Sequence, residues 1–156
     1  MKNILFRGKR TDNNEWVYGG YYLEPYTNNT YIVSWNSFCL GFVEHIKVDP
    51  QTLGQSTGLL DSDDVPIFEG DILIFGDVLL TVYWNGETFQ WQAKKAVQYP
   101  HRRFPDENWD YIDLGWIAAE VPINGKMTTQ IGGNIYDNAS SFFIAEDEDT
   151  WKEIEF

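Results

Sequence analysis

Short apolar runs alternate with turn-forming residues along most of the chain. Turn signals, mainly Gly, Asn and Asp, recur about every eight to fifteen residues, and stretches such as EWVYGGYYLE place apolar residues at alternating positions. Alternation with this period is typical of a strand that has one buried face, and closely spaced turns are typical of all-β proteins. The pattern therefore predicts a mostly β fold with few short helices.

The clearest local signal is the segment TVYWNGETFQW, residues 81–91. Asn85 and Gly86 can both adopt positive φ, which the two central residues of a type I′ turn need. The sequence therefore predicts that such a turn joins two strands, at about 78–84 and 87–93.

A second chain reversal is predicted just before this hairpin. Gly76 and Asp77 follow the apolar run 71–75, so a turn there gives a three-stranded meander, with which a small barrel can begin. One face of the meander is expected to carry four apolar side chains, those of Ile72, Ile74, Val82 and Trp84.

Two segments depart from this pattern. Residues 98–116 combine two prolines with charges of both signs and several aromatic residues, which predicts a long loop that either binds a partner or plugs one end of the barrel. The tail, 141–156, is acidic and forms either a short amphipathic helix or a frayed end. The chain thus divides into an N-terminal β segment, 1–60, a small barrel, 61–140, and this tail.

The composition favours strands and restricts the partners. The chain has 156 residues with 7 Trp, 9 Tyr and 10 Phe, and aromatic side chains are enriched in strands. Its 24 acidic and 11 basic residues give a formal net charge of -13, which repels nucleic acids and anionic membranes. Basic residues nevertheless cluster near 2–10 and 94–103, which leaves a local basic patch open.

The cysteine count and the apolar runs indicate a compartment. Cys39 is the single cysteine, so no intramolecular disulfide and no thiolate zinc cluster can form, and a reducing environment is expected. The N-terminal apolar stretch is too short for a signal peptide, and no apolar run approaches the about 20 residues of a membrane-spanning helix. We therefore expect a cytoplasmic protein that has no membrane partner.

The candidate reactive groups lack the neighbours that catalysis or metal binding requires. Cys39 and His45 lie on adjacent apolar runs, but a lone cysteine there is typical of a buried packing residue, and His45 is expected to face solvent or a neighbour. The glycines of IGGNIY, residues 131–136, lack the dinucleotide-binding spacing and predict a tight bend between short strands. We expect no catalytic residue, no cofactor and no metal.

Three aspartates, Asp61, Asp63 and Asp64, resemble the start of a calcium loop, but the loop pattern fails at Pro66 and Ile72. An acidic turn is the better interpretation, because Asp side chains accept hydrogen bonds from nearby backbone amides.

The tripeptide Glu69-Gly70-Asp71 lies between two apolar runs, and its two carboxylates raise the question of an acid–base pair. A structural role is the stronger hypothesis. Gly70 then makes a bend that a β-carbon would disfavour, Asp71 accepts a backbone hydrogen bond, and Glu69 lies on an exposed turn.

Three separated segments resemble the YopX-like proteins of bacteriophages and prophages. The chain opens with Arg-Gly-Lys and a Trp-x-Tyr-Gly strand, continues with Asp-Pro-x-Thr-x-Gly-Gln, Thr-Gly-Leu and Glu-Gly-Asp, and closes with IGGNIY. The residues that carry this resemblance set the backbone shape, and they are Arg7, Gly8, Trp16, Tyr18, Gly19, Asp49, Pro50, Thr52, Gly54, Gln55, Gly58, Glu69, Gly70, Asp71, Gly132, Asn134 and Tyr136. The chain departs from the family at Gly132-Gly133, where one Gly is usual, and at Ala139, where Pro often stands.

The resemblance implies a mostly β fold in which an N-terminal β segment packs with a C-terminal SH3-like barrel. It also implies that the protein acts in the cytoplasm of a host bacterium and is encoded by a phage or prophage. It implies no established activity, so no catalytic residue can be assigned from it.

Three functions remain open. The first is a non-enzymatic module that binds a host or phage protein, and the residues of its possible interaction surface are Trp91, Tyr99, Arg102, Arg103 and Trp109. The second is a nucleic-acid-binding small barrel that uses the basic clusters, against which the net charge counts. The third is an enzyme or small-ligand protein with a carboxylate site at Glu69 and Asp71, or with a sugar platform made of Trp84, Trp91 and Trp109. The oligomeric state is also open.

Overall fold

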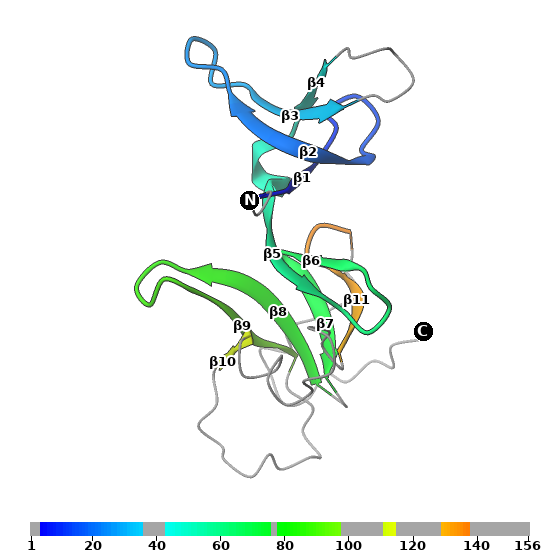
Figure 1. Ribbon diagram of the computed structural model, residues 1–156, viewed down its shortest axis with the longest axis vertical. Helices are drawn as coiled ribbons and strands as arrows, with labels where there is room; N and C mark the ends of the chain where they lie inside the picture. Colours follow the sequence, from blue (N-terminus) through cyan, green and yellow to red (C-terminus); the bar gives the residue numbers. More distant parts are fainter. Residues whose placement is uncertain (1–3, 36–42, 76–77, 98–110, 115–128, 138–156) are drawn as a thin grey trace, which may run out of the picture. The chain divides into compact units, whose positions relative to one another are not determined.

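A computed structural model describes residues 4–35, 43–75, 78–97, 111–114 and 129–137 of the chain. These residues fold almost wholly into antiparallel strands (Figure 1), which confirms the mostly β fold. The chain separates into two compact units, Met1–Gly58 and Leu59–Phe156, and each is described by itself. Among the described residues, no helix has the length and the apolar composition that crossing a membrane would require.

The strands form two sheets. The first sheet has the order β4-β3-β2-β1-β5-β6, and its strands are β1 (Phe6–Lys9), β2 (Trp16–Leu23), β3 (Thr30–Trp35), β4 (Val43–Val48), β5 (Gly54–Leu60) and β6 (Pro66–Phe68). The second has the order β10-β9-β8-β7-β11, and its strands are β7 (Asp71–Phe75), β8 (Val78–Asn85), β9 (Gln90–Val97), β10 (Tyr111–Asp113) and β11 (Gln130–Asn134). A short 3-10 helix, η1 (Pro50–Thr52), connects β4 to β5.

In the first unit, the strands β1 to β4 curl around a small core. Strand β2 pairs with β1 through residues 16–19 and with β3 through residues 20–23, so it changes its partner halfway along its length. An isolated bridge between Arg10 and Val48 then brings the end of β4 back beside the end of β1. The side chains of Ile32 and Val48 are completely buried inside this curl.

Two glycines allow the strands to come this close. A β-carbon on Gly8 would lie 3.0 Å from the side chain of Val48, and one on Gly19 would lie 2.2 Å from the carbonyl oxygen of Val33. The second distance is far below any real carbon–oxygen contact, so Gly19 admits no side chain unless β2 and β3 move apart. Gly8 and Gly19 therefore set the packing of this unit.

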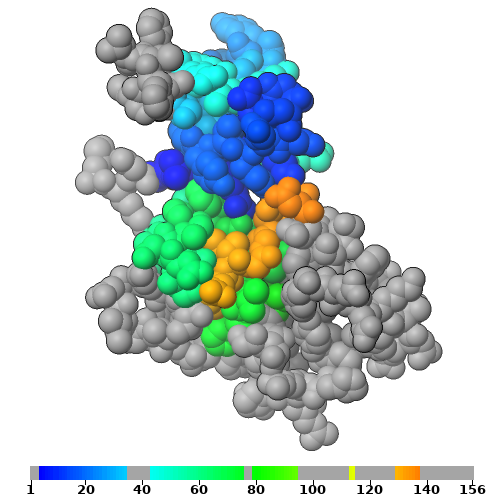
Figure 2. Space-filling view, turned by 90° about the vertical axis from the view of Figure 1, so that its right-hand side faces the viewer, coloured from blue at the N-terminus to red at the C-terminus, as the bar shows by residue number. Residues whose placement is uncertain are grey.

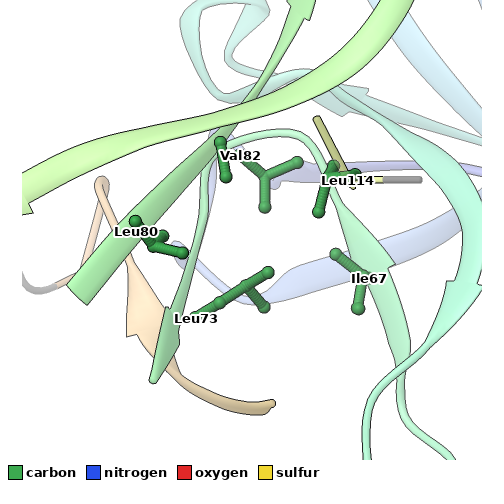
Figure 3. Packing of buried hydrophobic residues seen from close by; sticks show 6 residues of the cluster. Ile67, Leu73, Leu80, Val82 and Leu114 are labelled. Carbon is green, nitrogen blue, oxygen red and sulfur yellow. The ribbon is translucent and has the colours of Figure 1, made fainter. Parts of the chain in front are cut away.

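In the second unit, the core lies on one face of the five-stranded sheet (Figure 3). The side chain of Ile67 from β6 meets those of Leu73, Leu80 and Val82 there, and the cluster also includes Ala93 and Leu114. These side chains are all at most 1% exposed. Figure 2 shows β11, in orange, beside the green strands of the same unit, and β11 pairs with β7. Within the described ranges this sheet is open, so its strands do not by themselves close the barrel that the sequence suggested.

The hairpin predicted at residues 81–91 is present, but the prediction of a type I′ turn is wrong. Asn85 pairs with Gln90, which leaves a four-residue loop, and positive φ falls on Phe89 (54°) rather than on Asn85 or Gly86. The reason is the side chain of Asn85, whose Oδ1 accepts the backbone amide of Glu87 at 2.9 Å. This side-chain turn replaces the two-residue backbone turn.

The predicted apolar face of the meander is also wrong. Strands β7 and β8 do form an antiparallel pair, in which Ile72 lies opposite Thr81. Residues that lie opposite each other share one face of a sheet, so Ile72 and Ile74 lie on the other face from Val82 and Trp84. The two-residue connection places Phe75 opposite Val78 and thereby fixes this register. The conformation of Gly76 and Asp77 lies outside the described residues.

The glycines of IGGNIY, which were predicted to make a tight bend, lie in a strand instead, and a turn follows at residues 135–137. Residues Gln130–Asn134 form β11, whose register with β7 shifts between Ile131 and Gly133, as in a β-bulge. A β-carbon on Gly132 would lie 2.8 Å from the side chain of Ile74, so this position is closely packed against β7. A bulge takes up the extra glycine without breaking the strand.

Candidate functional site

The Asp-Pro-x-Thr segment, residues 49–52, makes hydrogen bonds that join two strands of the first unit. The carboxylate of Asp49 caps η1 by accepting the amide of Gln51 at 3.0 Å. The hydroxyl of Thr52 accepts the amide of Lys9 at 2.8 Å and donates to the carbonyl of Asp49 at 2.8 Å. The amide of Asp49 in turn donates to the carbonyl of Lys9 at 2.8 Å. The segment therefore ties the chain after β4 to the end of β1.

The Glu69-Gly70-Asp71 corner serves the fold of the second unit, as predicted for Gly70 and Asp71. Gly70 has a φ of 82°, and a β-carbon there would lie 3.0 Å from the ring of Tyr136. The carboxylate of Asp71, only 1% exposed, accepts the backbone amide of Phe68 at 2.8 Å. Glu69 is half-buried, so the expectation that it lies on an exposed turn is wrong.

The acidic turn predicted at residues 61–64 is confirmed, and the side chain of Asp61 binds backbone amides there. The carboxylate of Asp61 is 3% exposed, and its Oδ1 accepts the amides of Asp63 and Val65 at 2.9 and 2.8 Å. Its Oδ2 accepts the amide of Ile131 at 3.2 Å, which ties the turn to β11. In the ranges that the structure describes, no group of three His, Cys, Asp or Glu residues is arranged to hold a metal ion.

Basic residues of the first unit also make local contacts. The guanidinium of Arg7 lies 4.6 Å from the ring centre of Trp16, and Arg7 is only 6% exposed. The side chain of Arg10 donates two hydrogen bonds, of 2.8 and 2.6 Å, to the carboxylate of Asp12. These bonds lower the pKa of Asp12 to about 2 and raise the pKa of Arg10 above its usual value. Arg7 and Arg10 are therefore engaged within the unit.

The surface suggested by the sequence is described only in part. Trp91 is half-buried and packs against the core, and its ring meets that of Trp84 edge-on, with centroids 5.1 Å apart and an interplanar angle of 68°. Two rings at this angle do not form the flat platform suggested for a sugar. Four positions of this surface lie outside the described residues, and they are Tyr99, Arg102, Arg103 and Trp109; Cys39 and the acidic tail, 141–156, lie outside them as well. The predicted loop 98–116 is described only at residues 111–114, and there the prediction is wrong, because Tyr111–Asp113 form β10, which pairs with β9.

A second set of aromatic residues, not selected from the sequence, comes together on the first unit. Tyr22 of β2 lies opposite Tyr31 of β3, and Tyr31 lies opposite Lys47 of β4. The ring of His45 lies 6.0 Å from that of Tyr22 and 6.5 Å from that of Tyr31, and the two tyrosine rings are 6.2 Å apart. We call Tyr22, Tyr31, His45 and Lys47 the aromatic face.

The aromatic face is exposed on the outside of the curled sheet. Tyr22 is 41% exposed, His45 and Lys47 are also exposed, and Tyr31 is half-buried. The opposite side of the same strands faces the core that holds Ile32. His45 thus faces solvent and two neighbours, as the sequence predicted.

Gly20 lies beside these rings. Gly20 lies opposite Val33, and Val33 lies opposite His45, so these three positions form the row next to that of Tyr22 and Tyr31. A β-carbon on Gly20 would meet nothing closer than the carbonyl oxygen of Val33, at 3.9 Å. Unlike Gly19, Gly20 is therefore not required by packing and leaves open space among larger side chains.

The family is decided by the comparison with known proteins. The model of the family described as YopX protein matches residues 5–141 of the chain. The chain belongs to the YopX family. No curated protein matches it.

Several of the residues that carried the resemblance to YopX proteins have structural roles. A β-carbon on Gly8, Gly19 or Gly70 would lie 3.0 Å or less from a neighbouring atom. Thr52 and Asp71 accept hydrogen bonds from backbone amides. These YopX-signature residues therefore help to set how strands meet in this chain.

The aromatic face was missed because its members lie on three strands. Each strand alternates, but alternation does not tell which residue of one strand lies opposite which residue of the next. A predicted β2–β3 hairpin with Tyr22 opposite Tyr31 would have been the signal that finds it.

Proposed function

We propose that this YopX-family protein is a non-enzymatic module that binds another protein through the aromatic face. The observation that carries the proposal is the exposed cluster of Tyr22, Tyr31 and His45, whose rings contact one another on the outer side of the sheet. The core of the unit lies on the inner side, so these rings are not needed there. Tyrosine is enriched at protein interfaces because it offers a large, rigid surface with a polar end.

The use of the carboxylates supports a non-enzymatic role. Asp61 and Asp71 are buried and accept backbone amides, and Asp12 is held by Arg10. A general acid or base needs a carboxylate that is directed at a substrate. Of the carboxylates that stand in suggestive positions in the sequence, those of Asp61 and Asp71 bind backbone amides instead.

The proposed setting follows the family resemblance. We propose that the protein acts in a bacterial cytoplasm as an accessory protein of a phage or prophage, with a host or phage protein as its partner. The single cysteine supports a reducing compartment.

A pull-down with matched variants tests the proposal. The double variant Tyr22→Ala/Tyr31→Ala removes two rings of the aromatic face, while Tyr26→Ala removes a tyrosine that is 97% exposed outside the face. We expect wild type and Tyr26→Ala to retain the same partner from a lysate of a bacterium that carries the gene, and the double variant to lose it. Circular dichroism should show that all three proteins are folded.

A photo-crosslinking residue gives an independent measurement. A crosslinker at position 22 should trap the partner in living cells, and a crosslinker at position 26 should not. If the double variant retains every partner of the wild type, or if positions 22 and 26 trap the same proteins, the face does not bind the partner.

A further inference from the structure

We infer that the protein partner adds an extended segment, which contains a basic residue, to the open edge of β4. The inference rests on the proposed function and deepens it, because it specifies the chemistry of the partner and how its backbone is held. The observation that carries it is a row of backbone groups on β4 that point away from β3 and have no strand to pair with among the described residues.

The second edge of β4 is paired only at its end. β4 is the edge strand of the six-stranded sheet, and β3 covers one side of it. On the other side, the bridge between Arg10 and Val48 includes a hydrogen bond of 3.2 Å from the amide of Thr11 to the carbonyl of Lys47. Beyond Thr11 the chain turns back into the hairpin that leads to β2, so β1 reaches no farther along β4.

The direction of the remaining backbone groups follows from this bond. The carbonyl of Lys47 points away from β3, and alternate residues of an antiparallel strand direct their backbone groups to the same side. The amides and carbonyls of Val43 and His45 therefore also point away from β3, and they make no hydrogen bond within the described part of the chain. Val43 is 45% exposed and His45 is exposed. An antiparallel segment in line with β1 can bond to both groups of both residues, which is the geometry of strand addition.

The same geometry places Glu44 opposite the central residue of the added segment. Because Val43 and His45 exchange the hydrogen bonds, Glu44 lies in a pair without them, in which side chains approach most closely. Glu44 is exposed and forms no salt bridge with another described residue. A lysine or arginine opposite Glu44 gives an ion pair across the strands, and the next residue of the segment meets the exposed side chain of Val43. The expected motif is thus a basic residue followed by an apolar one.

The charged side chains around Glu44 leave this side of the strand acidic. The pKa of Arg10 is raised mainly by its hydrogen bonds to Asp12. The charges of Glu44 and Glu15 also raise it, so these four groups lie near one another. Lys47 alternates with Glu44 along β4 and therefore lies on the other side of the strand. Three acids around one arginine, which is already bound to Asp12, favour a positive charge in the partner.

A second copy of this chain fits the edge less well than a different protein. Two-fold pairing of β4 centred on Glu44 would place this residue opposite Glu44 of the second copy, and like charges directly opposite each other are destabilising. Pairing centred on His45 would place Val43 of the second copy opposite Lys47, whose carbonyl already accepts the amide of Thr11. The edge therefore favours a segment of another protein.

The probe is a displayed library of random peptides of about 12 residues, selected on the immobilised full-length protein at about 50 mM salt, where surface charges are weakly screened. We expect the selected peptides to share a Lys or Arg that is followed by an apolar residue. Synthetic peptides methylated at one backbone nitrogen at a time then test the pairing on unaltered protein. Methylation should abolish binding at every second residue and have little effect between, because only alternate amides point to β4.

Variants of β4 test the same edge from the protein. Val43→Pro removes an amide that does not pair with β3, at the first residue of an edge strand, where proline is tolerated, whereas Val43→Ala keeps this amide. Fluorescence anisotropy should give an affinity at least about tenfold lower for Val43→Pro than for Val43→Ala. Glu44→Lys should weaken binding about fivefold, and Glu87→Lys, the same charge change at an exposed position of the other unit, should not. Circular dichroism should show that all variants are folded.

Other outcomes would overturn the inference. If no peptide is selected, if methylation shows no alternation, or if Val43→Pro and Val43→Ala bind equally, no strand is added at this edge. Selected peptides without basic residues, or equal effects of Glu44→Lys and Glu87→Lys, would refute the charge preference. A wild type that is dimeric by light scattering, and that Val43→Pro makes monomeric, would assign the edge to a second copy.

The pull-down separates this inference from the proposed function. If Val43→Pro retains the partner that Tyr22→Ala/Tyr31→Ala loses, the aromatic face binds without the edge, so the inference fails and the proposed function stands. If Val43→Pro loses the partner that the double variant retains, the edge binds without the aromatic face, so the strand addition stands and the proposed function fails. If both variants retain the partner, both fail.

Discussion

Gly19 and Gly20 are adjacent, but the structure predicts opposite effects when each is replaced by alanine. A β-carbon on Gly19 would lie 2.2 Å from the carbonyl oxygen of Val33, whereas the same atom on Gly20 would be 3.9 Å from it. Relieving the first contact requires β2 and β3 to separate by about 1 Å, because a methyl carbon and an oxygen normally approach to about 3.3 Å.

The magnitudes follow from these two distances. Forcing one extra carbon into a packed site costs about 1–3 kcal/mol, and the pairing of Gly20 with Val33 is weakened as well. We therefore expect Gly19→Ala to lower the free energy of unfolding by about 2–3 kcal/mol. Gly20→Ala should raise it by about 0.4–1 kcal/mol, because alanine restricts the unfolded chain and meets no obstacle in the folded one.

Urea unfolding followed by tryptophan fluorescence and far-ultraviolet circular dichroism measures both changes. The slope of the free energy against urea should be unchanged, so that the shift in midpoint reports stability alone. Equal stability of Gly19→Ala and the wild type would refute the close approach of β2 to Val33. A Gly20→Ala protein as unstable as Gly19→Ala would refute the claim that a β-carbon at Gly20 meets no obstacle.

Three further predictions concern the corner, the acidic turn and the surface ion pair. Gly70→Val should destabilise the protein by about 1–3 kcal/mol in the same urea assay, because φ is 82° and Tyr136 fills the space of a side chain; unchanged stability would contradict this. Asp61→Ala should cost at least about 2 kcal/mol, because backbone amides in the turn and in β11 lose their acceptor, and a cost below about 0.5 kcal/mol would exclude the role. The pKa of Asp12 is lowered to about 2, so its ion pair with Arg10 stabilises the fold above the ordinary carboxyl value near 4 and is lost as the pH falls towards 2. Nuclear magnetic resonance titration of the carboxyl carbon should show a midpoint near 2, and Arg10→Gln should return it towards 4.

The sequence predicts correctly where one residue or its immediate neighbours decide the structure. The bend at Gly70, the backbone bond of Asp71 and the acidic turn of Asp61 depend mainly on the conformational freedom of glycine and on the short reach of aspartate. Even so, the bond from Ile131 to Asp61 joins residues far apart in the chain and was not predicted.

The predictions that failed depend on pairing or on competition between turns. The two faces of the meander were assigned wrongly because the register of β7 and β8 follows from the loop between them, not from alternation within each strand. Asn85 can support either a type I′ turn or a side-chain turn, and the longer loop allows the second. The aromatic face needs three strands in one register, so residue patterns alone could not locate it.

Strand β2 pairs with β3 over its second half, and this local pairing has a consequence for the order in which the unit folds. Every pairing that builds the aromatic face joins neighbouring strands, from β2 through β3 to β4. The bridge between Arg10 and Val48 and the pairing of Phe6 with Gln55, by contrast, join residues much farther apart in sequence. Closing long segments costs more chain entropy than closing short ones, so we expect the local meander to form first. On a ribosome, the surface that we assign to the partner would then take shape before the strand that completes its scaffold, β5, has emerged from the exit tunnel.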